Sequence, residues 1–186
     1  MHSRSNMRRC LTVLVALAGM SISGVVVAQE SPYSEMTARE VKSLSSEQTR
    51  GYLEGGGMGM ALPGELNGYP GPKHVLELRQ ELGLSIGQLA QVESFFDSMQ
   101  QKAVQLGREI VEREAGLDAL FASGEIDEAS LSRLTEEIGR LNGRLRGVHL
   151  RAHLETAAAL SPNQRQRYSQ LRGYGEGHST GHEGHH

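Results

Sequence analysis

Two histidines set four residues apart are the residues of this chain most suited to chemistry. His149 and His153 occur in the stretch HLRAH. On a helix this spacing puts both imidazoles on one face, where they can share a metal ion. Imidazole nitrogen suits Zn²⁺, Ni²⁺, Co²⁺ or Cu²⁺, and we expect zinc first. The alternative is that both side chains flank a helix seam and only hydrogen-bond to their neighbours.

The end of the chain offers a second group of metal ligands. The stretch GHSTGHEGHH sets four histidines among glycines, namely His178, His182, His185 and His186. A glycine-rich tract can wrap around a metal ion but does not preset the geometry of its ligands. Such a tract releases metal as protons compete below a histidine pKa of about 6.5. We therefore expect residues 175–186 to form a tail that scavenges metal.

The spacing of apolar residues predicts that the histidine pair lies on a long helical hairpin. From Ser85 to about Ala122, and again from Leu131 to Ala152, apolar residues recur in steps of three and four, as on the seam of a coiled coil. The turn FASGEID separates the two stretches, with a glycine to end one helix and Asp127 to cap the next. The residue numbers of facing seam positions have a constant sum, in the pairs Leu120 with Leu131, Leu117 with Leu134, Ile110 with Leu141, Leu106 with Leu145, Ala103 with Val148 and Met99 with Ala152. A constant sum is what an antiparallel hairpin requires.

This register supplies further metal-ligand candidates. His153 lies opposite Ser98, which brings the neighbouring Asp97 within reach as a carboxylate ligand. A shorter helix is expected from Pro72 to the break at Gly83, and His74 on it is a further nitrogen candidate. The predicted metal site combines His149, His153, His74 and Asp97.

One short phrase is repeated three times in the chain, as LSSEQ from Leu44, LSIGQ from Leu84 and LSPNQ from Leu160. In each copy a serine is followed three residues later by a glutamine, which is the pattern of a capping box. The phrase therefore predicts three helix starts, with the last helix running from Ser161 to about Arg172.

The first residues have the build of a secretory signal. Basic residues precede an uncharged apolar stretch from Leu11 to Val27, and Ala28 suits cleavage before Gln29. The alternative is an uncleaved membrane anchor. Cleavage would remove the single cysteine and three arginines, so that the 19 basic residues fall to 16 against 22 acidic ones, a formal charge of −6. The mature chain would then have no disulfide and no thiolate, and nucleic acid is not an expected partner.

The chain is predicted to contain four segments. Residues 1–28 form the signal peptide, 29–71 a flexible lead, 72–174 a helical domain and 175–186 the tail. The lead is polar and interrupted by glycine and proline, with one short helix from Ser45 to Glu54. The chain has no tryptophan and only three phenylalanines. This shortage of bulky side chains favours helices packed along narrow seams over a large globular core. The predicted fold class is all-α, a long antiparallel helical hairpin with short flanking helices.

The pair of boxes LSIGQ and LSPNQ, in this helical order and behind an export signal, resembles the LTxxQ motifs of the Spy/CpxP and zinc-resistance-associated family of periplasmic proteins. The resemblance covers about Tyr69 to Tyr174, with serine where the family commonly has threonine. It implies a four-helix hooked hairpin that dimerises. It also implies either ATP-independent chaperone activity or the sensing and buffering of divalent metals in the periplasm.

The resemblance further implies a set of metal ligands. Family members that sense cobalt and nickel use a first-helix histidine, a second-helix glutamate and a third-helix histidine four residues before a further ligand. His74 and the pair His149 and His153 match this set in kind. Phe96 stands where we would align the glutamate, so Glu93 or Asp97 would have to substitute for it.

Apolar residues outside the main seam bear on the partners of the chain. They are Phe95, Val104, Val111, Leu150 and Leu154, and they need cover either from short helices of the same chain, through Leu76, Leu78, Leu82, Tyr168 and Leu171, or from a second chain. We expect a homodimer whose remaining apolar patches, with the basic run of Arg140, Arg144, Arg146 and Arg151, hold unfolded client proteins. The alternative function is a metal or envelope-stress sensor that acts on a membrane partner. An enzyme is not expected, because no motif assembles the scattered Ser, His and Asp residues.

Overall fold

The computed structural model describes residues 31–174, and every regular element in that range is a helix. The elements are the 3-10 helix η1 (Ser34–Ala38) and the α-helices α1 (Ser46–Leu53), α2 (Leu62–Glu65), α3 (Pro72–Glu77), α4 (Ile86–Ser123), α5 (Glu128–Ala159) and α6 (Pro162–Leu171). The predicted all-α class is confirmed. None of the helices between residues 31 and 174 is long and apolar enough to cross a membrane. The expected signal peptide and the tail histidines lie outside the described residues.

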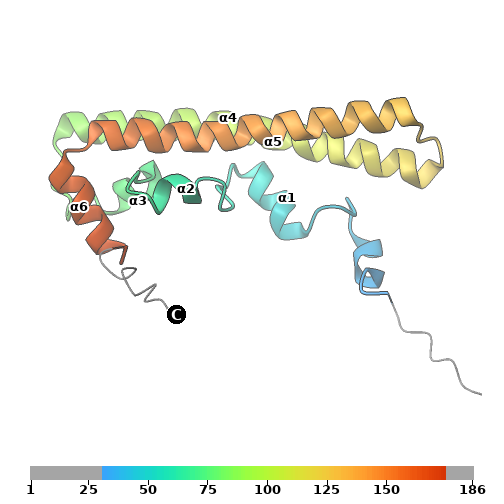
Figure 1. Cartoon of the computed structure of the whole chain (residues 1–186), viewed down its shortest axis with the longest axis horizontal. Helices are drawn as coiled ribbons and strands as arrows, with labels where there is room; N and C mark the ends of the chain where they lie inside the picture. The colour runs from blue at the N-terminus through green and yellow to red at the C-terminus, as the bar shows by residue number, and fades with distance from the viewer. Residues whose placement is uncertain (1–30, 175–186) are drawn as a thin grey trace, which may run out of the picture. The chain divides into compact units, whose positions relative to one another are not determined.

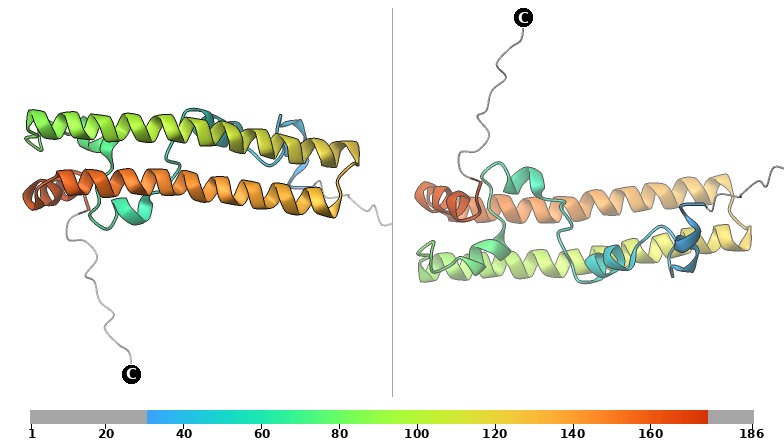
Figure 2. Two further views of the ribbon diagram at one scale, coloured as in Figure 1. Left: turned by 90° about the horizontal axis from the view of Figure 1, so that it is seen from above. Right: turned by 90° about the horizontal axis from the view of Figure 1, so that it is seen from below.

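The two long helices α4 and α5 lie side by side and run antiparallel, as Figures 1 and 2 show. Gly124 ends α4 in the left-handed conformation, at φ 73°, and Asp127 caps α5 by accepting a hydrogen bond from the Ser130 backbone N–H. A buried cluster along the seam joins residues of both helices, namely Ala103, Leu106 and Ile110 with Leu141 and Leu145. The cluster contains both members of the predicted pairs Ile110 with Leu141 and Leu106 with Leu145, and the antiparallel hairpin is confirmed.

All three repeats of the LSxxQ phrase form capping boxes. Ser45, Ser85 and Ser161 each accept from the backbone N–H three residues on, and each glutamine accepts from the backbone N–H of its own serine. Two of the boxes also meet in space, since the side-chain amide of Gln88 donates to Gln164 Oε1 at 2.8 Å and receives a bond from Gln164 Nε2 at 3.1 Å. The repeated motif thus starts α4 and α6 and also ties these two starts together.

A second buried cluster lies at the base of the hairpin, where α4 begins and α5 ends. It contains Val75, Leu82, Val92, Leu160 and Tyr168. The predicted helix from Pro72 to Gly83 is shorter than expected, because α3 ends at Glu77 and the chain then winds through turns to Gly83, which has φ 59°. These turns bring Leu82 into the same core as Val75.

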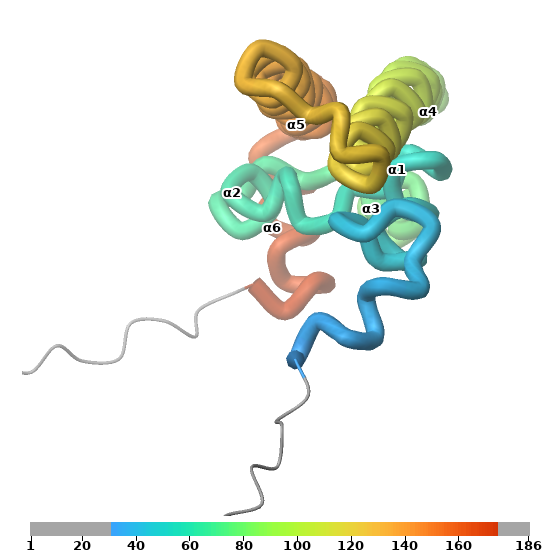
Figure 3. Tube along the Cα trace, turned by 90° about the vertical axis from the view of Figure 1, so that its right-hand side faces the viewer, coloured from blue at the N-terminus to red at the C-terminus, as the bar shows by residue number. Residues whose placement is uncertain are grey.

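The segment before α3 packs against the hairpin. The sequence predicts a flexible lead over residues 29–71, whereas residues 35–71 belong to the same compact unit as α4 and α5. Figure 3 shows α1, α2, α3 and α6 together on one side of the two long helices. Gly107 makes this packing possible, because a Cβ at that position would lie 1.9 Å from the Tyr52 carbonyl oxygen. Such a contact between distant residues leaves no trace in local periodicity.

Candidate functional site

His149 is buried on α5 and lines a pocket of about 500 Å³ between the hairpin and the segment before it. Its side chain is only 3% exposed, and among residues 31–174 its Nε2 has no hydrogen-bond partner. A buried polar atom without a partner is costly in a folded protein, where most such atoms are satisfied. This nitrogen is a candidate ligand atom, and because it is enclosed, the ring must turn for it to reach a ligand in the pocket.

His153 lies one turn further along α5, as the sequence predicts, and lines the same pocket. Its Nδ1 is 2.7 Å from the Tyr69 carbonyl oxygen. Because a carbonyl oxygen can only accept, Nδ1 carries the proton and Nε2 of the neutral ring keeps its lone pair. Gly71 packs closely on this nitrogen, since a Cβ there would lie 2.9 Å from Nε2. The carbonyl therefore orients the imidazole in the way that outer hydrogen bonds orient metal-ligating histidines.

A buried carboxylate, that of Glu65 at the end of α2, lies between two of the histidines. Its Oε2 is 3.6 Å from His153 Nδ1, and its Oε1 is 3.6 Å from His74 Nδ1. The Gly71 backbone N–H donates to Oε2 at 3.0 Å. Only 7% of Glu65 is exposed, so the carboxylate is enclosed with the histidines instead of being solvated on the surface.

The position of the carboxylate differs from the one that the sequence suggests. Asp97 is exposed on α4 and does not line the pocket, although its neighbour Phe96 does, and Glu93 is also exposed. The carboxylate that lies beside His153 is that of Glu65, whereas the sequence suggested Asp97. Sequence reasoning missed it because it lies in a stretch rich in glycine and proline that shows no helical periodicity. The only local signal is the proline in LPGE, which favours a helix start.

The electrostatic environment favours the neutral form of His149. Burial lowers the pKa of this imidazole, and the positive charge that His153 can carry lowers it further. A histidine must be unprotonated to bind a metal ion, so a lowered pKa keeps the ligand form available at mildly acidic pH. On the other side of Glu65, burial and then the hydrogen bond to the carboxylate raise the pKa of Tyr168, which keeps this phenol a hydrogen-bond donor.

The donors fit a transition metal by type, but the pocket is not closed around one. Three histidines and two glutamates, Glu54 and Glu65, line it, and the orphaned Nε2 of His149 is the strongest observation in favour of a ligand. In the part of the chain that the structure describes, no group of three or more His, Cys, Asp or Glu residues is arranged to hold a metal ion. Coordination therefore requires the side chains to rotate within the pocket. The four tail histidines lie outside the described residues.

The fold and the pocket together define a class, that of all-helical hairpin proteins with nitrogen and oxygen donors gathered at the base of the hairpin. Comparison with known families agrees. A family model described as heavy-metal resistance matches residues 55–167, and the chain belongs to this family. The match includes Glu65, His74 and both histidines of α5. No curated protein and no solved structure shows a significant match.

Proposed function

We propose that this protein is a periplasmic metal-binding stress protein of the heavy-metal resistance family. In this proposal, a divalent transition metal, with Zn²⁺ first, binds in the pocket between α5, α2 and α3. His149 and His153 supply nitrogen through Nε2, His74 supplies a third imidazole and Glu65 an oxygen. The observation that carries the proposal is the buried, unpartnered Nε2 of His149 in the described part of the chain, one helical turn from His153. A bound metal ion would accept the lone pair of this nitrogen.

The charge of the proposed ligands favours the binding of a divalent cation. Three neutral imidazoles and one carboxylate would carry a net charge of −1, which reduces the cost of transferring a divalent cation from water. The ligands come from three elements, so a bound ion would cross-link α2, α3 and α5. We propose that the tail histidines His178, His182, His185 and His186 add a second site that captures metal.

Metal titration by calorimetry tests this proposal. The reference protein is the full mature chain with the four tail histidines replaced by serine, called here the tail-silenced chain. It should bind one Zn²⁺ per protomer near neutral pH, and the replacement of His149 and His153 by alanine should abolish this uptake. The replacement of Asp97 by asparagine is the matched control and should leave it unchanged. A tail-silenced chain that takes up no Zn²⁺ would overturn the proposed pocket.

The proposed location is tested by the N-terminus of the exported protein. A mature chain that begins at Gln29 supports a soluble periplasmic protein. A chain recovered from membranes with Leu11 to Val27 intact supports the alternative function, a sensor that reports to a membrane partner.

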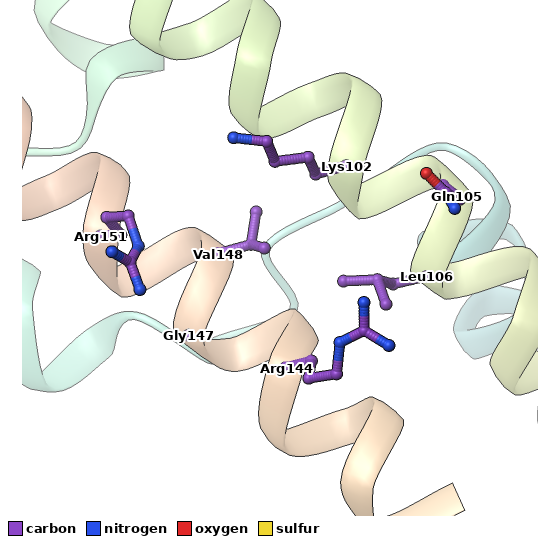
Figure 4. A pocket seen from close by; sticks show the side chains of 7 residues that line it. All are labelled: Lys102, Gln105, Leu106, Arg144, Gly147, Val148 and Arg151. Carbon is purple, nitrogen blue, oxygen red and sulfur yellow. The ribbon is translucent and has the colours of Figure 1, made fainter. Parts of the chain in front are cut away.

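A chaperone activity is a second candidate function, favoured by a groove between α4 and α5. The groove has a volume of about 430 Å³. Of the residues that line it, Figure 4 shows the basic Lys102, Arg144 and Arg151 around the apolar Leu106 and Val148. Basic groups beside apolar surface suit segments of unfolded chains that carry both acidic and apolar residues. Of the predicted basic run, Arg144 and Arg151 line the groove, whereas Arg140 and Arg146 do not.

Suppression of aggregation measures this second activity. A stoichiometric excess of the protein should reduce light scattering by an aggregating client, and the replacement of Arg144 and Arg151 by serine should weaken the effect. The replacement of Arg140 and Arg146 by serine is the matched control, because it removes the same charge from the same helix outside the groove. Equal suppression by both variants would count against the groove, and the absence of suppression by the native chain against the activity.

A homodimer is the partner that the exposed apolar side chains favour. Leu154, an apolar residue outside the main seam, is 56% exposed. The residues predicted to pack against such side chains, Leu76, Leu78 and Leu82, instead pack in the core at the base of the hairpin. A second copy could cover Leu154. Light scattering after size exclusion should give twice the mass of one chain, and the replacement of Leu154 by glutamate should shift it toward the monomer.

A further inference from the structure

The carboxylate of Glu65 joins the histidine pocket to the last helix. Its Oε1 accepts a hydrogen bond from the Tyr168 hydroxyl at 2.5 Å and another from the Tyr174 hydroxyl at 3.2 Å. Its Oε2 accepts from the Gly71 backbone N–H at 3.0 Å and faces His153. One side of the same group therefore contacts the C-terminal end of the fold, and the other side contacts the candidate metal ligands.

The lone pairs of this carboxylate can be assigned one by one. Each carboxylate oxygen has two, and both of those on Oε1 are used by the two tyrosine hydroxyls. The backbone N–H of Gly71 uses one of the two on Oε2. The lone pair that is left belongs to Oε2, the oxygen 3.6 Å from His153 Nδ1, which donates to the Tyr69 carbonyl. The hydrogen bonds thus leave one acceptor position of the carboxylate unused, on the oxygen nearer to His153.

The two tyrosines hold Glu65 with unequal strength. Tyr168 is 1% exposed and packs in the core cluster with Val75, Val92 and Leu160, so the position of its hydroxyl is set by the core. Tyr174 lies beyond the end of α6 and is partly exposed. The guanidinium of Arg172 adds a positive charge, with Nε 3.7 Å from Oε1. The start of α6 is itself anchored, through the pair of Gln164 and Gln88.

We propose that Tyr168, assisted by Tyr174, is a positioning residue for the metal site, so that the site is complete only when α6 is docked on the base of the hairpin. This inference rests on the proposed function, since it assumes that Glu65 is a metal ligand. Tyr168 holds the carboxylate in the pocket beside His74 and His153, where Oε2 keeps one unused lone pair. Loss of an outer hydrogen bond of this kind typically weakens metal affinity by about 10 to 100-fold.

The coupling must act in both directions. If the docked α6 raises the affinity of the pocket for metal, a bound metal ion stabilises the docked α6 by the same factor. Metal occupancy would then be reported at the C-terminal end of the domain, next to the histidine-rich tail. The binding of metal in the pocket would in this way fix the point from which the tail extends.

Zinc titrations of tyrosine variants in the tail-silenced chain test the inference. Tyr168→Phe should raise the Kd for Zn²⁺ by about 10 to 100-fold, and Tyr174→Phe should raise it less. The matched control is Tyr52→Phe, which also loses a hydroxyl hydrogen bond, here to Asn142 Oδ1 at 3.0 Å, but lies away from the pocket. Absorption of Co²⁺ in place of Zn²⁺ should change in Tyr168→Phe and not in Tyr52→Phe, because it responds to the coordinated oxygen.

The outcomes separate this inference from the proposed function. Zinc uptake by the tail-silenced chain, together with equal affinities for Tyr168→Phe and Tyr52→Phe, overturns the positioning role and leaves the metal pocket standing. No uptake by the tail-silenced chain overturns the pocket itself. If Tyr168→Phe does not fold, hydrogen exchange of the unsubstituted tail-silenced chain decides. Amides of residues 162–174 should exchange more slowly with Zn²⁺ bound, and an unchanged rate in a zinc-loaded protein overturns the coupling.

Discussion

Between residues 86 and 110 of α4 the seam residues Val92, Ala103, Leu106 and Ile110 are buried, whereas between residues 111 and 137, around the turn of the hairpin, only Leu134 is. We call residues 86–110 together with residues 138–159 the covered half, and residues 111–137 the tip. Both regions carry the same apolar pattern in the sequence. The covered half carries additional packing, since the Tyr52 carbonyl of α1 lies over Gly107 and Val75 of α3 shares a core with Val92.

Two contacts that reach the tip from the preceding segment are polar, and the neighbouring Val41 and Leu44 of that segment are buried. Lys42 Nζ lies 3.1 Å from Asp118 Oδ2, and the Ser43 hydroxyl donates to Glu114 at 2.7 Å. Polar contacts at the surface contribute little to stability, since water competes for the same groups. The comparison shows that a heptad seam pairs two helices, but that a third layer is needed to exclude water from the seam. The histidine pocket lies under that third layer, in the covered half.

The largest expected effect is the loss of a buried leucine in the covered half. Leu145→Ala should lower the free energy of unfolding by about 2–5 kcal/mol, because Leu145 is 1% exposed and its removal leaves a cavity in the core. Leu120→Ala in the half-buried tip should lower it by about 1 kcal/mol. Urea unfolding followed by circular dichroism measures both. Equal losses would contradict the difference between the two regions.

Glycine substitutions should have opposite signs in the two regions. Gly107→Ala should cost about 1–3 kcal/mol, because its Cβ would collide with the Tyr52 carbonyl and displace α1. Gly116→Ala on the same helix meets nothing within 4 Å and should stabilise the protein by about 1 kcal/mol through helix propensity. Thermal unfolding should show the two melting temperatures on opposite sides of that of the native chain. A stabilising Gly107→Ala would show that α1 does not pack there.

A smaller effect is expected at mildly acidic pH, through His149 in the covered half. Burial lowers the pKa of His149 in the folded state, while in the unfolded chain a histidine titrates near about 6.5. The unfolded state therefore binds more protons below about pH 6.5, and the stability of the metal-free protein should fall as the pH drops through this range. Above it this contribution is constant.

Urea unfolding at pH 7.5 and pH 5.5 with a chelator present would measure this dependence. His149→Gln should reduce it, whereas Leu120→Ala in the tip should preserve it. The same loss of stability with pH in His149→Gln and in the native chain would mean that another group is responsible.

The smallest effect is expected at the ion pair of the tip. Arg113 Nε lies 2.9 Å from Glu137 Oε2, with both side chains partly exposed. A double-mutant cycle of Arg113→Gln and Glu137→Gln should give a coupling of about 0.5 kcal/mol that decreases with added salt. A coupling above about 2 kcal/mol would mean that the tip excludes water as the covered half does.

Much of the fold could be predicted from the sequence because its signals are local. The capping boxes at Ser45, Ser85 and Ser161 are formed as predicted, since each involves residues three positions apart. The hairpin register followed from facing apolar residues on two helices joined by a short turn. The position of His149 and His153 on one helix face required only that α5 be helical.

The candidate site could be predicted only in part. The imidazoles of α5 were predicted, and the structure places His74 beside the same pocket. The carboxylate was not, since Glu65 contacts His153 and Tyr168 across long stretches of chain and lies in a segment without periodicity. The docking of that segment depends on Gly107, whose missing side chain admits the Tyr52 carbonyl.

The sequence by itself therefore determined the helices, their caps, the pairing of the hairpin and the two histidines of α5, because these follow from the period of a helix and from neighbours a few residues apart. Only the tertiary structure decided which half of the seam is buried, which carboxylate faces the imidazoles and that α6 contacts the same group. These are contacts between residues distant in the chain, and they depend on how surfaces fit together in three dimensions.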